Sequence, residues 1–237
     1  MFTKRIIRLE SVDSTNTYLN RLAEEGADEG TVVVAECQSA GRGTAGRSFF
    51  SPAGEGLYLS VLLRPEAELS QLLTLTGRAA AAVRNAVEKA CGAPCQIKWL
   101  NDIYLNGKKL CGILAECSPD GKRVILGVGI NLCQSTETFG AQGLGGIATS
   151  LAAEGYSVDR EHLLRHVLEE LGEMYRRFPD GLEECLRDYR AHCLTIGRQV
   201  EYREDGVTYT GTADDVDGDF ALVVEGRRVR SGTVSLK

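Results

Sequence analysis

A glycine-rich loop that no helix follows is the feature that most restricts how this chain can fold. Residues 41–47 read Gly-Arg-Gly-Thr-Ala-Gly-Arg, shortly after the strand-like segment 31–36. The glycine spacing matches the dinucleotide-binding fingerprint and comes close to the P-loop, but both motifs need a helix that opens at the end of the loop and binds the phosphates. Pro52 and Gly54 stand where that helix would run, and an arginine replaces the P-loop lysine. The sequence therefore argues against a nicotinamide dehydrogenase and against a P-loop nucleotidase.

Positive charge is concentrated at this loop and at a second cluster farther along the chain. Arg42 and Arg47 lie among glycines that let backbone N–H groups approach an anion. Lys98 adds a mobile charge on a stiff segment, 98–102, that reads Lys-Trp-Leu-Asn-Asp. The whole chain carries a formal charge of −6, which does not suit a nucleic-acid-binding protein, so we interpret these cations as placed for one small anion. The pairing predicts a loop that closes over phosphate; the alternatives are a solvated surface loop and a tryptophan that only fills the core.

Hydrophobic periodicity predicts helices and strands mixed along residues 1–190. Asn106-Gly107 suits a tight hairpin turn, and the alternating Gly127 and Gly129 indicate a strand that a ligand or another backbone approaches closely. Helices are expected directly after the capping residues 13–16 and over 70–90, 160–178 and 182–192. Strands are expected over 31–36, 57–62, 103–105, 109–114 and 124–132.

Residues 191–237 show a different sequence pattern from the rest of the chain. Short β-like stretches are separated there by Asp-Gly and Glu-Gly pairs, with no helical period, which predicts a small all-β domain packed on the rest. Among the eight cysteines, the spacings Cys91/Cys95 and Cys111/Cys117 are not Cys-x-x-Cys, so we interpret these four as small buried residues rather than zinc ligands. No apolar window fits a signal peptide or a membrane span, and we therefore expect a cytoplasmic protein without membrane contact.

Taken together, the ordered motifs resemble those of the biotin–protein ligases, also called biotin–[acetyl-CoA-carboxylase] ligases. The resemblance covers nearly the whole chain and rests on a set of segments, each of which is unspecific alone: 13–16, 41–47, 98–103, 109–114 and 127–132. It implies an α+β fold, with a mixed-sheet catalytic domain related to class II aminoacyl-tRNA synthetases over 1–190 and a small C-terminal SH3-like β-barrel over 191–237. The match begins at residue 13, so we expect neither the N-terminal helix-turn-helix of some bacterial members nor nucleic acid as a partner.

The resemblance also implies which residues form the site. Lys98 and Arg42 would act on the carboxylate and the α-phosphate. No Mg²⁺ ligand is implied; by its position next to the hairpin, Asp102 is either such a ligand or a structural carboxylate. The residues implied for biotin and the adenylate are Ser14, Thr15, Asn16, Gln38, Gly41, Arg42, Gly43, Thr44, Lys98 and Gly112. Those implied for the nucleotide are Arg47, Phe49 and Asn131.

Three positions depart from the family pattern. Thr44 stands where the family usually has arginine, so one cation that could hold the adenylate is missing. Leu100 replaces the usual proline after Lys-Trp, which costs some rigidity but no chemistry. Phe49 replaces a frequent tryptophan and can still stack on adenine.

The implied enzyme activates biotin with MgATP to biotinyl-5′-AMP and transfers biotin to a lysine of a biotin carboxyl carrier domain, as in acetyl-CoA carboxylase. The substrate carboxylate is the nucleophile, which fits the absence of a Ser-His-Asp or Cys-His pattern. Two alternatives stay open: a lipoate–protein ligase of the same fold and a non-catalytic ligand-binding relative, against which the retained Lys98, Arg42 and Arg47 argue. Family members often pair through sheet edges, so a homodimer is among the expected assemblies.

Overall fold

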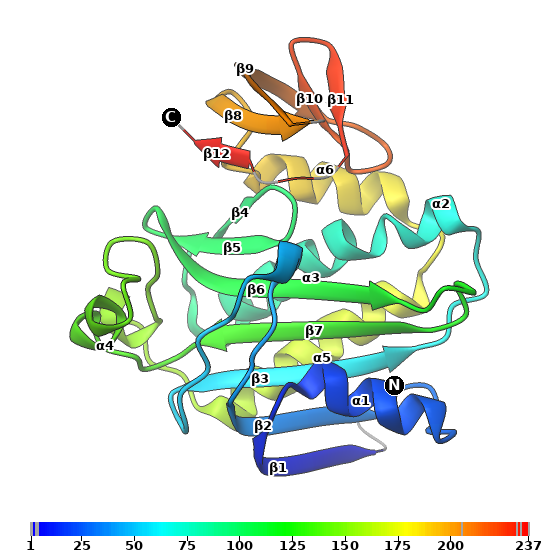
Figure 1. The fold of residues 1–237 in the computed structure, drawn as a ribbon, viewed down its shortest axis with the longest axis vertical. Coiled ribbons are helices and arrows are strands. Elements are labelled where there is room, and N and C mark those ends of the chain that lie inside the picture. The colour runs from blue at the N-terminus through cyan, green and yellow to red at the C-terminus, as the bar shows by residue number, and fades with distance from the viewer. Residues whose placement is uncertain (1, 3–4, 205, 231, 233, 237) are drawn as a thin grey trace.

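A large mixed β-sheet carries helices on both faces, and a small antiparallel sheet lies at one end of the molecule (Figure 1). The computed structural model describes residues 2, 5–204, 206–230, 232 and 234–236. The large sheet contains β1 (Ile6–Val12), β2 (Val32–Gln38), β3 (Gly56–Leu63), β4 (Gln96–Lys98), β5 (Asp102–Leu105), β6 (Lys108–Cys117) and β7 (Val124–Asn131). The small sheet contains β8 (Gln199–Glu204), β9 (Val207–Val216), β10 (Leu222–Val224), β11 (Arg227–Val229) and β12 (Val234–Leu236).

The large sheet is mixed because it contains both parallel and antiparallel strand pairs. Within the described residues its order is β1-β2-β3-β7-β6-β5-β4, and that of the small sheet is β11-β10-β9-β8-β12. Among these neighbours β1 and β2 pair in parallel, and the other pairs are antiparallel. The predicted α+β class, with a mixed sheet followed by a small β module, is confirmed.

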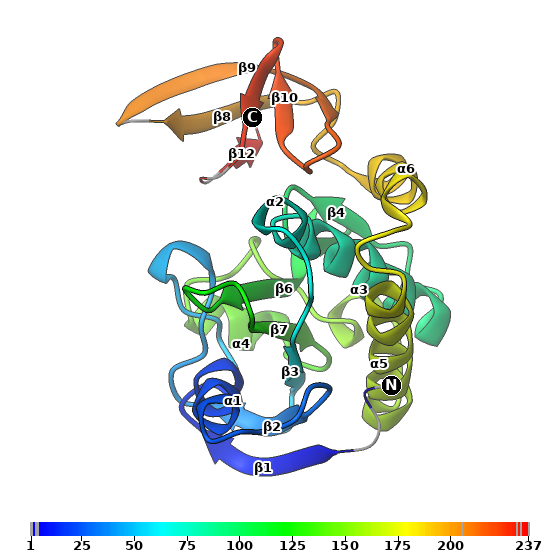
Figure 2. The same cartoon turned by 90° about the vertical axis from the view of Figure 1, so that its right-hand side faces the viewer.

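Helices cover both faces of the large sheet (Figure 2). On one face, α1 (Thr15–Glu24) packs over β2, β3 and β7. On the other face, α3 (Leu75–Cys91) and α5 (Arg160–Arg176) pack side by side, and α6 (Leu182–His192) packs on α3. The short helices are α2 (Leu69–Leu72) and α4 (Thr136–Ala141), with 3₁₀ turns at Thr44–Gly46 and Ala152–Glu154.

The alternation of side chains along the central strands produces two cores. Val32 and Val34 of β2 join the large core beneath α3 and α5, whereas Val33 joins a smaller core beneath α1. β3 is buried along its whole length because helices cover both of its faces. On the α1 face, β3 carries the polar side chains of Tyr58 and Ser60, which prepares that face for a polar site.

Most predicted elements are present, and the hairpin is confirmed in detail. Asn106 and Gly107 have φ values of 49° and 77° and connect β5 to β6. Both residues therefore adopt the left-handed conformation that a two-residue hairpin turn requires and that the Asn-Gly pair predicted. The strands predicted over 31–36, 57–62 and 124–132 correspond to β2, β3 and β7.

Two parts of the prediction need correction. The helix expected over 70–90 is divided into α2 and α3, because the Thr74 hydroxyl donates to the carbonyl of Gln71 (2.7 Å) and closes a turn at the junction. β1 was not expected, because it is an edge strand whose side chains are only half-buried or exposed and show no clear burial alternation. Its assignment depends on pairing with β2.

The small sheet is attached to the rest of the molecule through Phe220. The indole Nε1 of Trp99 donates to the Phe220 carbonyl (2.7 Å), and the Phe220 ring packs edge-on against Tyr189 with centroids 5.0 Å apart. Gly77 of α3 permits this approach, since a Cβ there would lie 2.2 Å from the Phe220 ring. Trp99 is thus a core residue that ties the end of β4 to the small sheet.

Neither the cysteines nor the helices indicate a metal cluster or a membrane span. All eight cysteines are free. Cys95 and Cys111 are buried as expected, but Cys91 is only half-buried, and the expectation is wrong for Cys117, which is exposed at the end of β6. Within the described ranges, no group of three or more His, Cys, Asp and Glu side chains could hold a metal ion. A search of the same residues finds no helix with the length and apolar character needed to cross a bilayer.

Candidate active site

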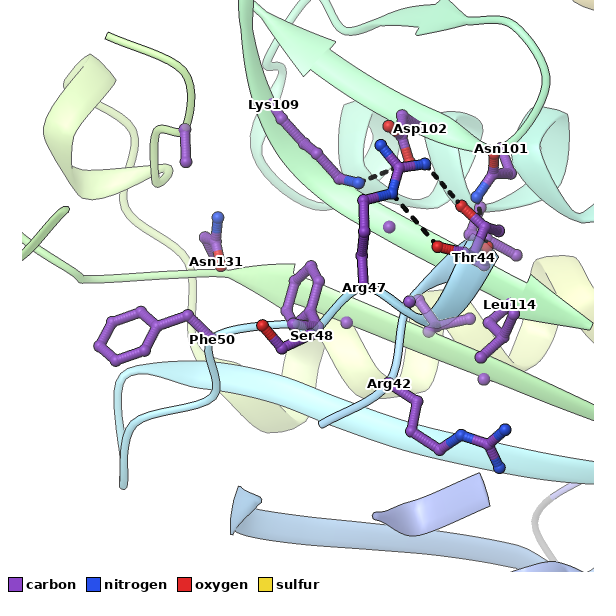
Figure 3. A pocket seen from close by; sticks show the side chains of 18 of the residues that line it. Arg42, Thr44, Arg47, Ser48, Phe50, Asn101, Asp102, Lys109, Leu114 and Asn131 are labelled. Carbon is purple, nitrogen blue, oxygen red and sulfur yellow. Dashed lines mark hydrogen bonds and ion pairs between the residues drawn. The ribbon is translucent and has the colours of Figure 1, made fainter. Parts of the chain in front are cut away.

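One cavity of about 360 Å³ gathers residues from the N-terminus of α1, the glycine-rich loop, β4 to β7 and the segment after β7 (Figure 3). Ser235 of β12 also lines it. Every site residue predicted from the sequence lies on its wall except Gly41. Gly41 stands where the two arms of the loop meet: a Cβ there would lie 2.4 Å from the Phe49 carbonyl oxygen, so this position has no room for a side chain. The structure therefore brings these distant residues to one cavity, while the roles assigned to them stay predictions.

At one end of the cavity, buried polar groups hold one another in place. Gln38 Oε1 accepts hydrogen bonds from the backbone N–H (2.9 Å) and hydroxyl (3.1 Å) of Thr15. Ser60 Oγ lies 2.7 Å from Thr15 Oγ1 and 2.6 Å from Asn16 Oδ1, and Gln38 Nε2 donates to Ser51 (2.9 Å). Such a paired network is rigid, so it can offer donors and acceptors in fixed directions.

Ser14 adds one more hydroxyl at this end. It occupies the N-cap of α1 and is buried, but its side chain makes no capping hydrogen bond. The hydroxyl is therefore not committed to the helix, unlike that of an ordinary N-cap serine.

The alternating glycines of β7 make room for side chains of this protein. A Cβ at Gly127 would lie 2.2 Å from Asn16 Oδ1, and a Cβ at Gly129 would lie 2.7 Å from Cε1 of Phe49. A Cβ at Gly112 of β6 would also lie 3.3 Å from Cε2 of the Phe49 ring. The expected close approach to these glycines is therefore present, but the approaching groups are the side chains of Asn16 and Phe49.

The glycine-rich loop forms a short hairpin over the cavity. Its arms are joined by Phe49 N–H to Gly41 O (2.8 Å) and Gly43 N–H to Arg47 O (2.7 Å). The tip turns through Ala45 and Gly46, which have φ values of 56° and 72°. We refer to residues 41–49 as the lid hairpin.

The two arginines of the lid hairpin point in different directions (Figure 3). Arg47 donates through Nη2 to the Thr44 hydroxyl (2.9 Å) and through Nε to the Thr44 carbonyl (3.2 Å). Arg42 turns away from the guanidinium of Arg47 and pairs with Glu116, with Nη2 2.8 Å from Oε1. At position 44 the family's usual arginine is therefore replaced by a threonine, whose hydroxyl orients the guanidinium of Arg47.

Three cations, Lys98, Lys109 and Arg47, and the carboxylate of Asp102 line the other end of the cavity. Lys109 Nζ lies 2.7 Å from Asp102 Oδ1, and Lys98 Nζ lies 3.5 Å from the Tyr104 hydroxyl. Burial is the largest effect on Lys98 and lowers its pKa; Asp102 raises that pKa, and Lys109 and Arg47 lower it further. Burial and the nearby Asp102 raise the pKa of Tyr104. A cluster with this excess of positive charge is suited to a phosphate or a carboxylate.

Asn131 supports the segment that follows β7. It is buried, its Nδ2 donates to the Thr149 carbonyl (2.9 Å), and its Oδ1 accepts from Gln134 Nε2 (3.3 Å). The segment also pairs with β6, through Lys109 N–H to Ile147 O (2.9 Å) and Thr149 N–H to Lys109 O (2.9 Å). Its apolar contributions to the cavity wall are Phe139, Leu144, Ile147 and Ala148.

Sequence reasoning missed several contributors to this wall, among them Lys109, Tyr104, Ser235 and the segment after β7. A register shift between β5 and β6 explains Lys109, because strict alternation from Gly112 would place it on the opposite face. The face on which Glu116 lies could have been found, because Glu116 is four residues beyond Gly112 on the same strand and period-2 alternation places both on one face. Its pairing with Arg42 could not, because the two residues lie on different segments.

Comparison with known proteins identifies relatives of the whole chain. The profile of the Biotin/lipoate A/B protein ligase family matches residues 9–131. The Bifunctional ligase/repressor BirA of Bacillus subtilis is 37% identical over 227 residues, which cover 94% of this chain and 70% of that protein. The Biotin–[acetyl-CoA-carboxylase] ligase of Mycobacterium tuberculosis is 36% identical over 91% of this chain and 82% of that protein. Among solved structures, the biotin protein ligase of Aquifex aeolicus in complex with biotin and ATP has a TM-score of 0.82, 31% identity and 99% coverage of both chains.

Proposed function

The chain belongs to the biotin/lipoate A/B protein ligase family and is a biotin–protein ligase, and we propose that the cavity on the α1 face is where it joins biotin to ATP. The enzyme activates biotin as biotinyl-5′-AMP, releases pyrophosphate, and then transfers biotin to a lysine of a biotin carboxyl carrier domain. Because the carboxylate of biotin attacks the α-phosphate, the protein has to position and neutralise anions and needs no nucleophile of its own.

The buried network at the N-terminus of α1 is suited to the head group of biotin. The ureido ring of biotin presents one carbonyl acceptor and two N–H donors, which need partners with fixed directions. Ser14, Thr15 and Gln38 supply hydroxyl and amide groups, and the pairing of Thr15 with Gln38 keeps them oriented before the ligand arrives. Asn16 contributes by holding the first turn of α1 against β3 through Ser60.

The observation that carries the proposal is the convergence of Lys98, Lys109 and Arg47 on one side of the cavity. Two unit charges about 4 Å apart repel by roughly 4 kcal/mol at an effective dielectric constant near 20, and a carboxylate approaching a polyphosphate meets at least this barrier. Preorganised cations offset that repulsion and stabilise the charge that develops on the α-phosphate. Lys98 and Arg42 take the catalytic roles, Arg47 holds the phosphates, and Lys109 joins them.

The adenosine part of ATP fits the neighbouring apolar wall. Phe49 lies over Gly112 and Gly129, and the segment after β7 adds Leu144 and Ile147 nearby. Gly43 and Thr44 belong to the lid hairpin, which closes over biotin and the adenylate. Since the amide of Asn131 is already paired with Thr149 and Gln134, Asn131 acts on the nucleotide by holding this segment in place.

The described residues do not form a dedicated magnesium site. Asp102 is the carboxylate among the three cations and is paired with Lys109, and Glu116 is paired with Arg42. Mg²⁺ prefers to keep several waters and to bind phosphate oxygens, so it enters as the counter-ion of ATP. Asp102 is accordingly assigned as the structural partner of Lys109.

The remaining features of the molecule fit this activity. We assign residues 1–190 as the catalytic domain and 191–237 as an accessory domain, because Ser235 is the one residue from the described portion of the second part that lines the cavity. The eight free cysteines support a cytoplasmic location, where thiols stay reduced. Pairing of two copies through an edge of the large sheet would use β1, because the opposite edge strand β4 is already bridged at Ile97 to Cys193.

ATP–pyrophosphate exchange tests the proposal directly. Exchange is measured with biotin, with lipoate and with neither, for the native chain, for Lys98→Ala and for Lys122→Ala, which alters an exposed lysine outside the cavity. We expect exchange with biotin alone, lost in Lys98→Ala and kept in Lys122→Ala. Exchange with lipoate alone would identify a lipoate ligase instead, absence of any exchange would identify a non-catalytic relative, and near-normal exchange in Lys98→Ala would refute the role of Lys98.

A further inference from the structure

Glu116 bridges the floor of the cavity and the lid hairpin. One carboxylate oxygen, Oε2, accepts a hydrogen bond from Asn16 Nδ2 (2.8 Å), and the other, Oε1, lies 2.8 Å from Arg42 Nη2. Glu116 stands near the end of β6 and is not itself part of the cavity wall, whereas both of its partners are. A carboxylate of the protein itself, that of Glu116, is therefore already paired with Arg42, one of the cations that line the cavity.

The two partners of Glu116 differ in burial and in their other contacts. Asn16 is buried and fixed, because Ser60 contacts its Oδ1 and the bare backbone of Gly127 receives its amide. Arg42 has a side chain 50% exposed and belongs to the lid hairpin. An exposed ion pair of this kind is weak, so a better-placed anion can displace it.

The pair with Glu116 keeps the Arg42 guanidinium away from the other cations of the cavity. In Figure 3 its guanidinium points away from Arg47, Asp102 and Lys109, on the opposite side of the lid hairpin. A carboxylate or phosphate bound among those cations would attract Arg42, and Arg42 can reach it only by leaving Glu116. Binding of the reactants and pairing with Glu116 therefore compete for one guanidinium.

We propose that Glu116 is a positioning residue that withdraws Arg42 from the reaction site and releases it when the acyl phosphate forms. The inference rests on the proposed function, since it assumes that biotinyl-5′-AMP is the anion bound. Its consequence is that Glu116 lowers the affinity for the adenylate and favours an open lid hairpin. Substrates and the acceptor lysine can then reach the cavity.

Glu116→Gln isolates the charge, because a glutamine keeps the shape and its amide oxygen can still accept from Asn16 Nδ2. The dissociation constant and dissociation rate of biotinyl-5′-AMP are measured for the native chain, Glu116→Gln, Arg42→Ala and the double variant. We expect Glu116→Gln to bind the adenylate about two- to fivefold more tightly, the range that an exposed ion pair contributes. In the Arg42→Ala background the same substitution should change the affinity by less than about 1.5-fold, which a general effect of the lost negative charge would not explain.

The outcomes separate this inference from the proposed function. Unchanged or weaker binding in Glu116→Gln, or an equal gain without Arg42, would overturn the role of Glu116 and leave the ligase activity standing. Absence of both adenylate binding and biotin-dependent exchange in the native chain would overturn the proposed function and this inference together. Loss of the Glu116 charge weakens its hydrogen bond with Asn16, so a small fall in the unfolding temperature of Glu116→Gln accompanies the expected result. A purely structural role would lower the unfolding temperature without tightening the adenylate.

Discussion

Gly127→Ala tests whether the floor of the cavity is as rigid as its contacts indicate. The new Cβ would lie 2.2 Å from Oδ1, 3.0 Å from Cγ and 3.2 Å from Nδ2 of Asn16, so the whole amide group has to move. Strand β7 cannot yield, because it is hydrogen-bonded to β3 on one side and to β6 on the other. Asn16 would therefore lose its contacts with Ser60 (2.6 Å) and Glu116 (2.8 Å).

The size of the effect follows from these two contacts. A buried hydrogen bond between neutral groups contributes about 0.5–1.5 kcal/mol, and one to a charged group about 1.5–3 kcal/mol, so we expect the free energy of unfolding to fall by roughly 2–4 kcal/mol. This is a large share of a typical total of about 5–15 kcal/mol. The affinity for biotin should fall as well, because Asn16 belongs to the turn that carries Ser14 and Thr15.

Urea unfolding and biotin titration measure both effects, with Gly218→Ala as the matched control. Gly218 is exposed, and a Cβ there would meet no atom within 4 Å, so its free energy of unfolding should stay nearly unchanged. Adding Gly127→Ala to Asn16→Ala should cost much less than adding it to the native chain, because the clash is gone. A loss below about 0.5 kcal/mol in Gly127→Ala, together with unchanged biotin affinity, would show that Asn16 is free to move and would refute this reasoning.

Two further predictions concern the cations above that floor. Thr44→Arg should slow the dissociation of biotinyl-5′-AMP by about tenfold. One added charge-assisted hydrogen bond contributes about 1.5–3 kcal/mol, and loss of the Thr44 contact to Arg47 offsets part of this gain. An unchanged dissociation rate in stopped-flow measurements would reject this prediction. Burial lowers the pKa of Lys98, so the ammonium is charged below that pKa and the affinity for ATP should begin to fall at a pH below the ordinary lysine value. Titrations across the alkaline range should show this fall in the native chain and not in Lys98→Arg, whose guanidinium stays charged; identical profiles would contradict the assignment.

Elements governed by neighbouring residues were predictable from the chain itself. The Asn106-Gly107 turn follows from the conformational preferences of those two residues, and the observed φ values agree. The absence of a helix after the glycine-rich loop is equally local, because Pro52 and Gly54 exclude it, and this observation removed the dinucleotide-binding and P-loop folds. The helix expected over 70–90 was wrong at Thr74, where a side-chain hydrogen bond to Gln71 competes with the helical pattern.

What the amino-acid order determined by itself was the set of local elements and the list of residues with the right chemistry for an acyl phosphate. The tertiary structure alone decided which of them meet. Lys109 reaches the cavity because the register of β6 shifts against β5, and Arg42 faces Glu116 because β6 runs beneath the lid hairpin. Arg42 and Glu116 are 74 positions apart in the sequence, and the place of Lys109 depends on strand register. Neither distance in space nor register is encoded in the pattern of any one segment, because both arise when the strands pair.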